Sequence, residues 1–185
     1  MLTFRKATMA DVPALEVLYE KGRAAIATFG IDQWQNGYPA KADIVKDIAE
    51  DILWVSEDTD VPGQIASVFA LLFDGEPTYD TIVGDDERPV GAWCTGDSHS
   101  YAAIHRITVS PEFRGRGIAG QTMAFGIQKA KEAGKTSLRI DTHRGNLAMR
   151  GMLAKNGFTH CGTIFLKSGE KRVAYETVFS TDDQT

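Results

Sequence analysis

The sequence predicts an α/β protein, a sheet combined with helices, folded as a single domain over residues 1–180. The chain has 185 residues, which is enough to bury a core without disulfides or metals. Its composition, with 43% hydrophobic, 24% charged and 9% aromatic residues, is that of a globular protein. Segments with strand-like alternation are interleaved with segments of helical periodicity. Together these observations favour one compact domain.

The first fifty residues predict a strand, a long helix, a loop and a short helix. The alternation from Leu2 to Ala7 is typical of a strand. Thr8, followed three residues later by Asp11, resembles a capping box that starts a helix. The long helix, the glycine- and proline-containing loop and the short amphipathic helix are predicted at residues 9–29, 31–40 and 42–50.

The rest of the chain predicts mainly strands, with two further helices. Two apolar runs separated by turn residues, 52–56 and 64–73, predict an antiparallel pair. The acidic, turn-rich stretch 74–100 is interpreted as a surface excursion with at most a short strand. A strand, a helix, a strand, a helix and two strands follow at residues 101–109, 117–133, 136–142, 147–156, 158–166 and 172–179. Residues 181–185 are expected to form a frayed tail.

Charge and cysteine content disfavour several classes of protein. A formal net charge of -5 disfavours nucleic-acid binding, which needs a basic face. Cys94 and Cys161 are far apart and form no CxxC pair, so we expect reduced, buried thiols, with neither a disulfide framework nor a metal site. Without a secretory signal or an apolar spanning run, the expected location is cytoplasmic, with no membrane partner. Homodimer formation is left open.

The segment most informative about function is the loop at residues 109–120, between a predicted strand and a predicted helix. The first N–H groups of a helix have no internal partner and lie at the positive end of its dipole. They therefore form a cradle for phosphate oxygens. Gly115 and Gly117 would let a ligand approach the backbone closely.

Two ligand classes use such a loop. Gly115, Gly117 and Gly120 spell the GxGxxG of dinucleotide-binding folds, with Asp141 near the place of the ribose acid. In that fold the first glycine follows its strand almost at once, whereas five residues intervene here after Val109. Too little chain also follows Asp141 to build the remaining parallel strands. A nicotinamide or flavin cofactor is therefore disfavoured.

The same loop resembles motif A of the GCN5-related N-acetyltransferases (GNAT): a strand leading to Val-x-Pro, then Arg or Gln, two residues, Gly, one residue, and Gly or Ala. The matching residues are Val109, Pro111, Arg114, Gly117 and Ala119. Downstream, residues 146–158 resemble motif B, an Asn-headed helix ending in Gly-Phe. The resemblance covers the whole order of elements, with 74–100 matching least. It implies the GNAT fold, a largely antiparallel sheet with a splayed central parallel strand pair flanked by helices.

The resemblance implies acetyl-CoA as co-substrate. Its pantetheine arm would lie along the strand at Ile107, Thr108 and Val109, where the backbone offers hydrogen-bonding groups. The loop amides would hold the pyrophosphate, namely those of Arg114, Gly115, Arg116, Gly117, Ile118 and Ala119. Asn146 would bond the coenzyme or an ordered water. A helix N-cap is the other interpretation of Asn146, and both roles can hold together.

The implied reaction is direct attack by a primary amine on the acetyl thioester in a ternary complex. An alkylammonium has a pKa near ~10, so a base has to remove a proton before the nitrogen attacks. His105 is the best candidate, because strand alternation would place it on the face of Ile107 and Val109. A hydrogen-bonded core histidine is the alternative.

The family's usual general acid is missing from the sequence. Many members carry a Tyr in the motif B helix that protonates the departing thiolate, at the place where this chain has Leu153. Tyr101, Tyr79 or His143 could substitute. This gap lends weight to an alternative function, a non-catalytic module that binds acyl-CoA as a sensor.

The acceptor is expected to be a small-molecule amine, an amino acid or a peptide amine. Trp34 and Tyr38 lie in a loop that walls the acceptor site in this family, and Tyr79 could line the same cleft. Aromatic side chains suit an amine through stacking or cation–π contact, although packing under a long loop accounts for them equally well. Asp141 and His143 form a second charged pair near the expected cleft.

Overall fold

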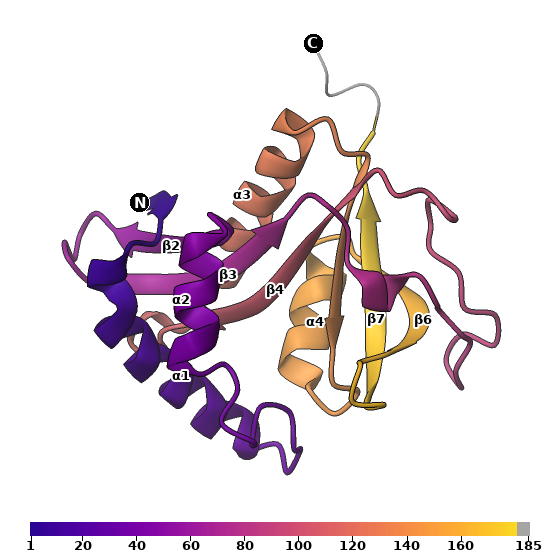
Figure 1. Ribbon diagram of the computed structural model, residues 1–185, viewed down its shortest axis with the longest axis horizontal. Coiled ribbons are helices and arrows are strands. Elements are labelled where there is room, and N and C mark those ends of the chain that lie inside the picture. The colour runs from indigo at the N-terminus through magenta and orange to yellow at the C-terminus, as the bar shows by residue number, and fades with distance from the viewer. Residues whose placement is uncertain (181–185) are drawn as a thin grey trace. The chain divides into compact units, whose positions relative to one another are not determined.

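The structure, a computed structural model, describes residues 1–180 (Figure 1). The tail predicted at 181–185 lies outside the described residues. The strands are β1 (Leu2–Lys6), β2 (Leu53–Asp58), β3 (Ile65–Leu72), β4 (Tyr101–Val109), β5 (Ser137–Thr142), β6 (Thr159–Phe165) and β7 (Lys171–Val178). The α-helices are α1 (Val12–Ala27), α2 (Lys41–Ala49), α3 (Ile118–Glu132) and α4 (Leu147–Lys155), and 3-10 turns occupy Met9–Asp11, Pro77–Tyr79 and Pro111–Phe113.

The strands form one mixed sheet in the order β1-β2-β3-β4-β5-β7-β6. β1, β2 and β3 pair antiparallel, as do β5 with β7 and β7 with β6. β4 and β5 form a parallel pair, with Tyr101–Ala103 opposite Ser137–Arg139. The predicted α/β class, with a largely antiparallel sheet and one parallel pair, is thus confirmed. The predicted divergence of that pair stays a prediction.

The chain divides into two compact units, which we describe separately. The first comprises Met1–Leu71 and His105–Met123, and the second comprises Leu72–Ile104 and the chain from Ala124 onward. The prediction of a single domain over residues 1–180 stays a prediction. No helix within residues 1–180 is both long and apolar enough to cross a membrane.

In the first unit, α1 and α2 pack against each other in front of the antiparallel strands (Figure 1). Their buried faces supply the core residues Leu15, Leu18, Tyr19 and Ile44. The predicted capping box is present, with the Thr8 N–H donating to Asp11 at 2.7 Å. It closes a 3-10 turn, however, and α1 begins only at Val12. Proline is tolerated in the first turn of α1, because N–H groups there have no intrahelical acceptor and the N–H that proline lacks is not needed.

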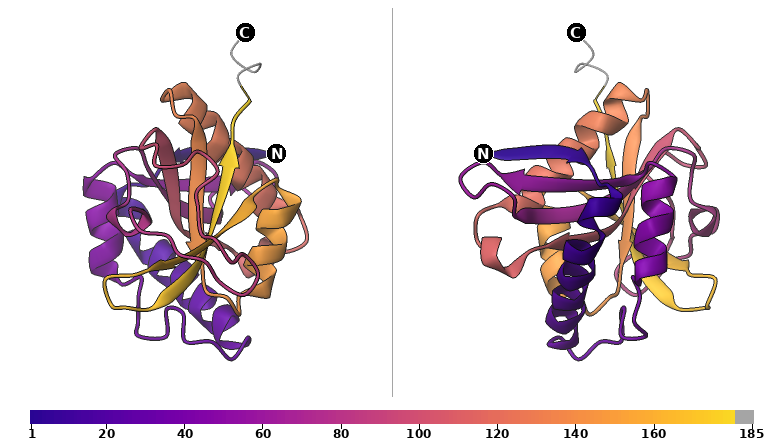
Figure 2. Two further views of the ribbon diagram at one scale, coloured as in Figure 1. Left: turned by 90° about the vertical axis from the view of Figure 1, so that its right-hand side faces the viewer. Right: turned by 60° about the vertical axis from the view of Figure 1, so that its left-hand side comes forward.

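In the second unit, the excursion that follows β3 runs beside β6 and β7 (Figure 2, left). Between residues 73 and 100 it holds one 3-10 turn and a single bridge from Val83 to Thr163, as the prediction of at most a short strand allowed. The excursion buries Tyr79 and Trp93 against Tyr101 of β4. It is therefore part of the core of this unit.

The second unit also contains a buried ion pair. Arg139 of β5 and Glu176 of β7 lie 3.0 Å apart, with side chains 3% and 0% exposed. Burial by itself would raise the pKa of Glu176. Hydrogen bonds donated by Ser137, Thr95 and Arg139 outweigh burial and hold that pKa below its ordinary value. Glu176 is therefore charged at neutral pH.

Candidate functional site

The loop between β4 and α3 is anchored at both ends within the first unit. The Ser110 N–H donates to the Ala66 carbonyl of β3 at 2.9 Å. Phe113 of the 3-10 turn and Ile118 at the start of α3 are buried in one cluster with Ala66. These apolar and backbone contacts fix the residues between them.

Gly115 and Gly117 shape the middle of the loop. Their φ angles are +76° and +72°, in the region that favours glycine. A Cβ at either position would meet no atom within 4 Å, so the loop is open on this side. The Gln121 N–H donates to the Gly117 carbonyl at 3.1 Å and closes the first turn of α3. The amides at 117–120 thus begin the helix without an intrahelical acceptor.

Two of the predicted phosphate-binding amides are used inside the loop. The Arg114 N–H donates to the Pro111 carbonyl at 3.2 Å, and the Arg116 N–H donates to Phe113 at 3.4 Å. The sequence could not show these short-range bonds, which follow from the 3-10 turn. The amides that fit an anion are therefore those of Gly115 and of residues 117–119.

The charges at the start of α3 also fit an anion. The first turn of α3 contains no acidic residue, so no carboxylate there repels an anion from the positive end of the helix dipole. Arg114 and Arg116 precede the helix and are exposed. Asp58, at the end of β2, pairs with the Arg116 guanidinium at 2.8 Å and so holds it beside the loop.

β4 departs from the predicted alternation before it reaches this loop. Arg106 has a φ of +55°, which regular strand geometry does not allow. His105 and Arg106 are consecutive half-buried residues, and Ile107 and Thr108 are consecutive buried ones. The alternation used to place His105 on the face of Ile107 and Val109 is therefore interrupted.

The Thr108 side chain faces α1. A Cβ on Gly22 of α1 would lie 2.9 Å from the Thr108 methyl carbon, so the absence of a side chain at Gly22 lets helix and strand approach. Because the side chain packs against α1, the coenzyme contact predicted for Thr108 would be made by its backbone.

Arg106 links β4 to the loop that contains Trp34 and Tyr38. Its guanidinium pairs with the Asp47 carboxylate of α2 through two nitrogens, at 2.8 and 2.9 Å. Another nitrogen donates to the Tyr38 hydroxyl at 2.7 Å. The Asp47 side chain is only 6% exposed, so the pair is shielded from solvent and geometrically fixed. Burial raises the pKa of Tyr38, although Arg106 opposes this, so its phenol stays protonated.

The predicted aromatic loop residues belong to a cluster. The rings of Trp34 and Tyr38 meet edge to face at 6.3 Å, and Trp34 also meets Tyr19 of α1 at 6.1 Å. Trp34 has a φ of +67°, which is a strained conformation for a bulky residue. Residues in such conformations are found most often at functional sites. Tyr19 is buried, and its hydroxyl has no hydrogen-bond partner among residues 1–180.

In the second unit, Tyr79 and Tyr101 are core residues, each 1% exposed. The Tyr79 hydroxyl donates to Asp141 at 2.8 Å. The Tyr101 hydroxyl accepts from the Glu76 N–H at 2.9 Å. Neither ring lies on an open surface, and both hydroxyls already have partners. The predicted role of Tyr79 in lining the acceptor site and that of Tyr101 as a general acid remain predictions.

The other predicted residues of this unit have local structural roles. The Asn146 side chain accepts from the Met149 N–H at 3.2 Å, which confirms its interpretation as the N-cap of α4. His143 Nδ1 accepts from the Gly145 N–H at 3.0 Å. Leu153, at the place where the resemblance would have put a tyrosine, is fully buried. The coenzyme contact of Asn146 stays a prediction.

Comparison with known proteins identifies the family. The model of the acetyltransferase (GNAT) family matches residues 43–158. The chain belongs to this family. The crystal structure of a GNAT acetyltransferase from Streptococcus agalactiae is 34% identical, with a TM-score of 0.83 over 97% of this chain and 96% of that one. Among curated proteins, no match was found.

More distant GNAT structures share the fold. A GNAT acetyltransferase from Listeria monocytogenes is 18% identical, with a TM-score of 0.69 over 96% of this chain and 95% of that one. A ribosomal-protein-alanine N-acetyltransferase from Brucella melitensis is 21% identical, with a TM-score of 0.61 over 96% of this chain and 99% of that one. Acetyl-CoA is the co-substrate of the GNAT family. The open glycines of the loop and its two exposed arginines, one of them paired with Asp58, fit the pyrophosphate of that co-substrate.

Two residues that hold Tyr38 and its loop in this GNAT protein, Arg106 and Asp47, were not predicted from the sequence. One signal was available for Asp47, which lies three residues after Ile44 and so on the apolar side of its helix. A charge on a buried face requires a partner. Nothing in the sequence identifies Arg106 as that partner, because the two residues are 59 positions apart.

Proposed function

We propose that this protein is an acetyl-CoA-dependent N-acetyltransferase that acts on a primary amine of a small molecule, an amino acid or a peptide. The observation that carries the proposal is the start of α3, where the amides of residues 117–119 have no intrahelical acceptor and Gly117 is open. Two exposed arginines precede these amides, and the first turn of the helix contains no acidic residue. This arrangement suits the diphosphate of coenzyme A. The pantetheine would then lie along the backbone of Ile107 to Val109.

In the proposed reaction the amine attacks the thioester carbonyl directly. A backbone N–H of the β4 segment from Ile107 to Val109 would stabilise the negative charge that develops on the carbonyl oxygen. The nitrogen attacks only after it loses a proton, which gives the reaction its requirement for a base. The coenzyme leaves as a thiolate of moderate basicity, so the reaction proceeds without the tyrosine that Leu153 replaces.

A turnover assay separates this proposal from the sensor alternative. Acetyl-CoA is incubated with a panel of small amines, amino acids and peptides, including a peptide with an N-terminal alanine as the Brucella protein's name suggests. Acetylated product is detected by mass spectrometry, because Cys94 is exposed and would react with thiol reagents. Turnover with any amine supports the enzyme, and tight acetyl-CoA binding without any product supports the sensor.

We propose His105 as the base and expect His105→Ala to lower kcat by about 100-fold, a typical contribution of general-base catalysis. The Kd for acetyl-CoA should change less than threefold. The pH profile gives the second readout, because the loss of a titrating base removes the acidic limb of the kcat curve. Full activity of the variant at every pH would exclude this assignment.

We further propose that Trp34 and Tyr38 contact the acceptor, with Arg106 as the residue that positions Tyr38. Tyr38→Phe should raise the KM for the amine about fivefold, the equivalent of one hydrogen bond of about 1 kcal/mol. The KM for acetyl-CoA should not change. Tyr175→Phe is the matched control, since its hydroxyl also accepts from an arginine, Arg150, at 2.9 Å, but outside the loop. Equal effects of the two substitutions would contradict a specific role for Tyr38.

A further inference from the structure

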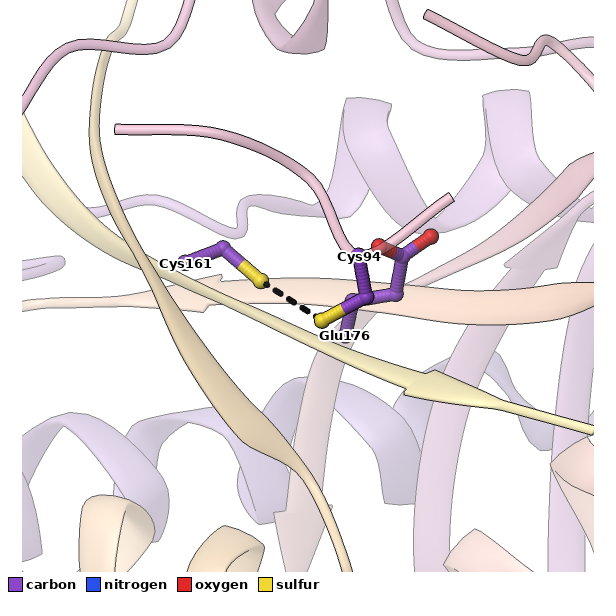
Figure 3. Close-up of side chains that lie close together, drawn as sticks. All are labelled: Cys94, Cys161 and Glu176. Atoms are coloured by element: carbon purple, nitrogen blue, oxygen red, sulfur yellow. Dashed lines mark hydrogen bonds between the residues drawn. The ribbon is translucent and has the colours of Figure 1, made fainter. Parts of the chain in front are cut away.

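The two cysteines lie side by side in the second unit. Cys94 and Cys161 are 67 residues apart in sequence, yet their sulfurs are 3.6 Å apart (Figure 3). Cys94 comes from a turn of the excursion, and Cys161 comes from β6. A disulfide bond is about 2.05 Å long, so the sulfurs need to approach by roughly 1.5 Å to be joined. Both cysteines are free thiols, but their distance in sequence did not indicate that they lie together, and Cys94 is exposed where a buried thiol was expected.

The turn that contains Cys94 is fixed by the buried ion pair. The Thr95 hydroxyl donates to Glu176 at 2.7 Å, and the Thr95 N–H donates to the other carboxylate oxygen at 3.2 Å. Arg139 donates to the Thr95 hydroxyl at 3.0 Å and to the Gly96 carbonyl at 3.2 Å. Because Thr95 is held at both its backbone and its side chain, Cys94 is held beside Cys161.

A metal ion is the other occupant that this cluster suggests, since Glu176 and the two cysteines offer ligand atoms within 4.8 Å of one another. The Glu176 carboxylate, however, already accepts hydrogen bonds from Ser137, Thr95 and Arg139. The cationic Arg139 lies 3.0 Å from it. A metal would have to displace these donors and sit beside a buried positive charge, so chemistry between the sulfurs is favoured.

The two thiols differ in access. Cys94 is exposed, whereas Cys161 is completely buried. Burial, with smaller contributions from Cys94 and Glu176, raises the pKa of the Cys161 thiol to about 12. A dissolved reagent therefore meets Cys94 first, and Cys161 stays a protonated thiol until its neighbour has reacted.

We propose that Cys94 and Cys161 form a reversible disulfide when the protein meets a low-molecular-weight disulfide. The Cys94 thiolate attacks one sulfur of the reagent, which forms a mixed disulfide and releases one thiolate. The Cys161 sulfur then attacks the Cys94 sulfur, which closes the protein disulfide. The second reagent thiolate leaves and takes up the Cys161 proton. The two cysteines are oxidised, and the reagent is reduced to two thiols.

Oxidised glutathione provides the test. Under non-reducing conditions, mass spectrometry of the whole protein should show one glutathione adduct, followed by its loss to a species two hydrogens lighter than the reduced protein. Peptide mapping should identify a Cys94–Cys161 link, and a dithiol should reverse it. The disulfide encloses a long segment of chain, so the oxidised protein should unfold at a Tm about 5–10 °C higher.

Variants separate the two steps. Cys161→Ala should stop at the glutathione adduct, and Cys94→Ser should form neither product. Thr95→Val should slow ring closure several-fold, because it removes the hydroxyl that fixes the Cys94 turn, while adduct formation is retained. Circular dichroism checks that each variant is folded.

Two results would overturn the proposal. One is a wild-type adduct that persists without closing under conditions in which the protein is folded. The other is stoichiometric binding of Zn²⁺ to the reduced protein that blocks the reaction and is lost in both cysteine variants. That result would assign the cluster to a metal instead. Neither result depends on acetyltransferase activity, so the outcome is independent of the proposed function.

Discussion

Replacing Gly117 with tryptophan is expected to abolish acetyl-CoA binding while the protein stays folded. Gly117 has a φ of +72°, and a Cβ there would meet no atom within 4 Å. An indole would therefore occupy the open side of the loop, where the diphosphate is proposed to bind. We expect calorimetry to show a Kd for acetyl-CoA at least about 100-fold higher, a loss of roughly 3 kcal/mol.

A matched variant separates this blockade from backbone strain. Gly134, just after the C-terminal end of α3, has a nearly identical φ of +70° and also meets no atom within 4 Å. Gly134→Trp therefore carries the same strain of about 1–2 kcal/mol, but no helix amides point at that end. Its acetyl-CoA affinity should equal that of the wild type. Equal losses in both variants, or no loss in Gly117→Trp, would remove the loop from the site.

Local sequence patterns predicted most of the elements that carry the site. The strand expected at 101–109 is β4, and the helix expected from 117 begins at Ile118. Gly134 and Gly157 follow their helices at positive φ, as C-terminal caps. These features are decided by residues close in sequence, which is why a pattern can predict them.

The features that were not predicted depend on contacts between distant residues. The irregular residue in β4, Arg106, is held by Asp47 of α2 and by Tyr38 of the loop before α2. No local sequence pattern predicts these contacts. The pairing of Cys94 with Cys161 likewise depends on where the excursion lies beside β6. Two charges in separate strand segments, Arg139 and Glu176, could not be paired without knowing that β5 lies next to β7.

Glu176→Gln should lower the free energy of unfolding by about 3–5 kcal/mol at neutral pH, because it leaves Arg139 charged, buried and without its carboxylate. For a chain of this length, the Tm should fall by about 10 °C. Glu132→Gln is the control, since it removes an exposed partner of Lys129 in α3 and should cost less than about 1 kcal/mol.

The pH dependence distinguishes a lost charge from poor packing of the glutamine. The folded protein holds the pKa of Glu176 below its ordinary value, so the unfolded state binds this proton more readily. The stabilisation is therefore fully present above the unfolded pKa of about 4.3 and is lost as the pH falls through the folded pKa. Denaturant titrations should show that the difference in the free energy of unfolding between wild type and Glu176→Gln becomes smaller as the pH falls below about 4.3. If this difference in the free energy of unfolding stayed constant from pH 7 down to pH 3, the charge of the carboxylate would not contribute to stability.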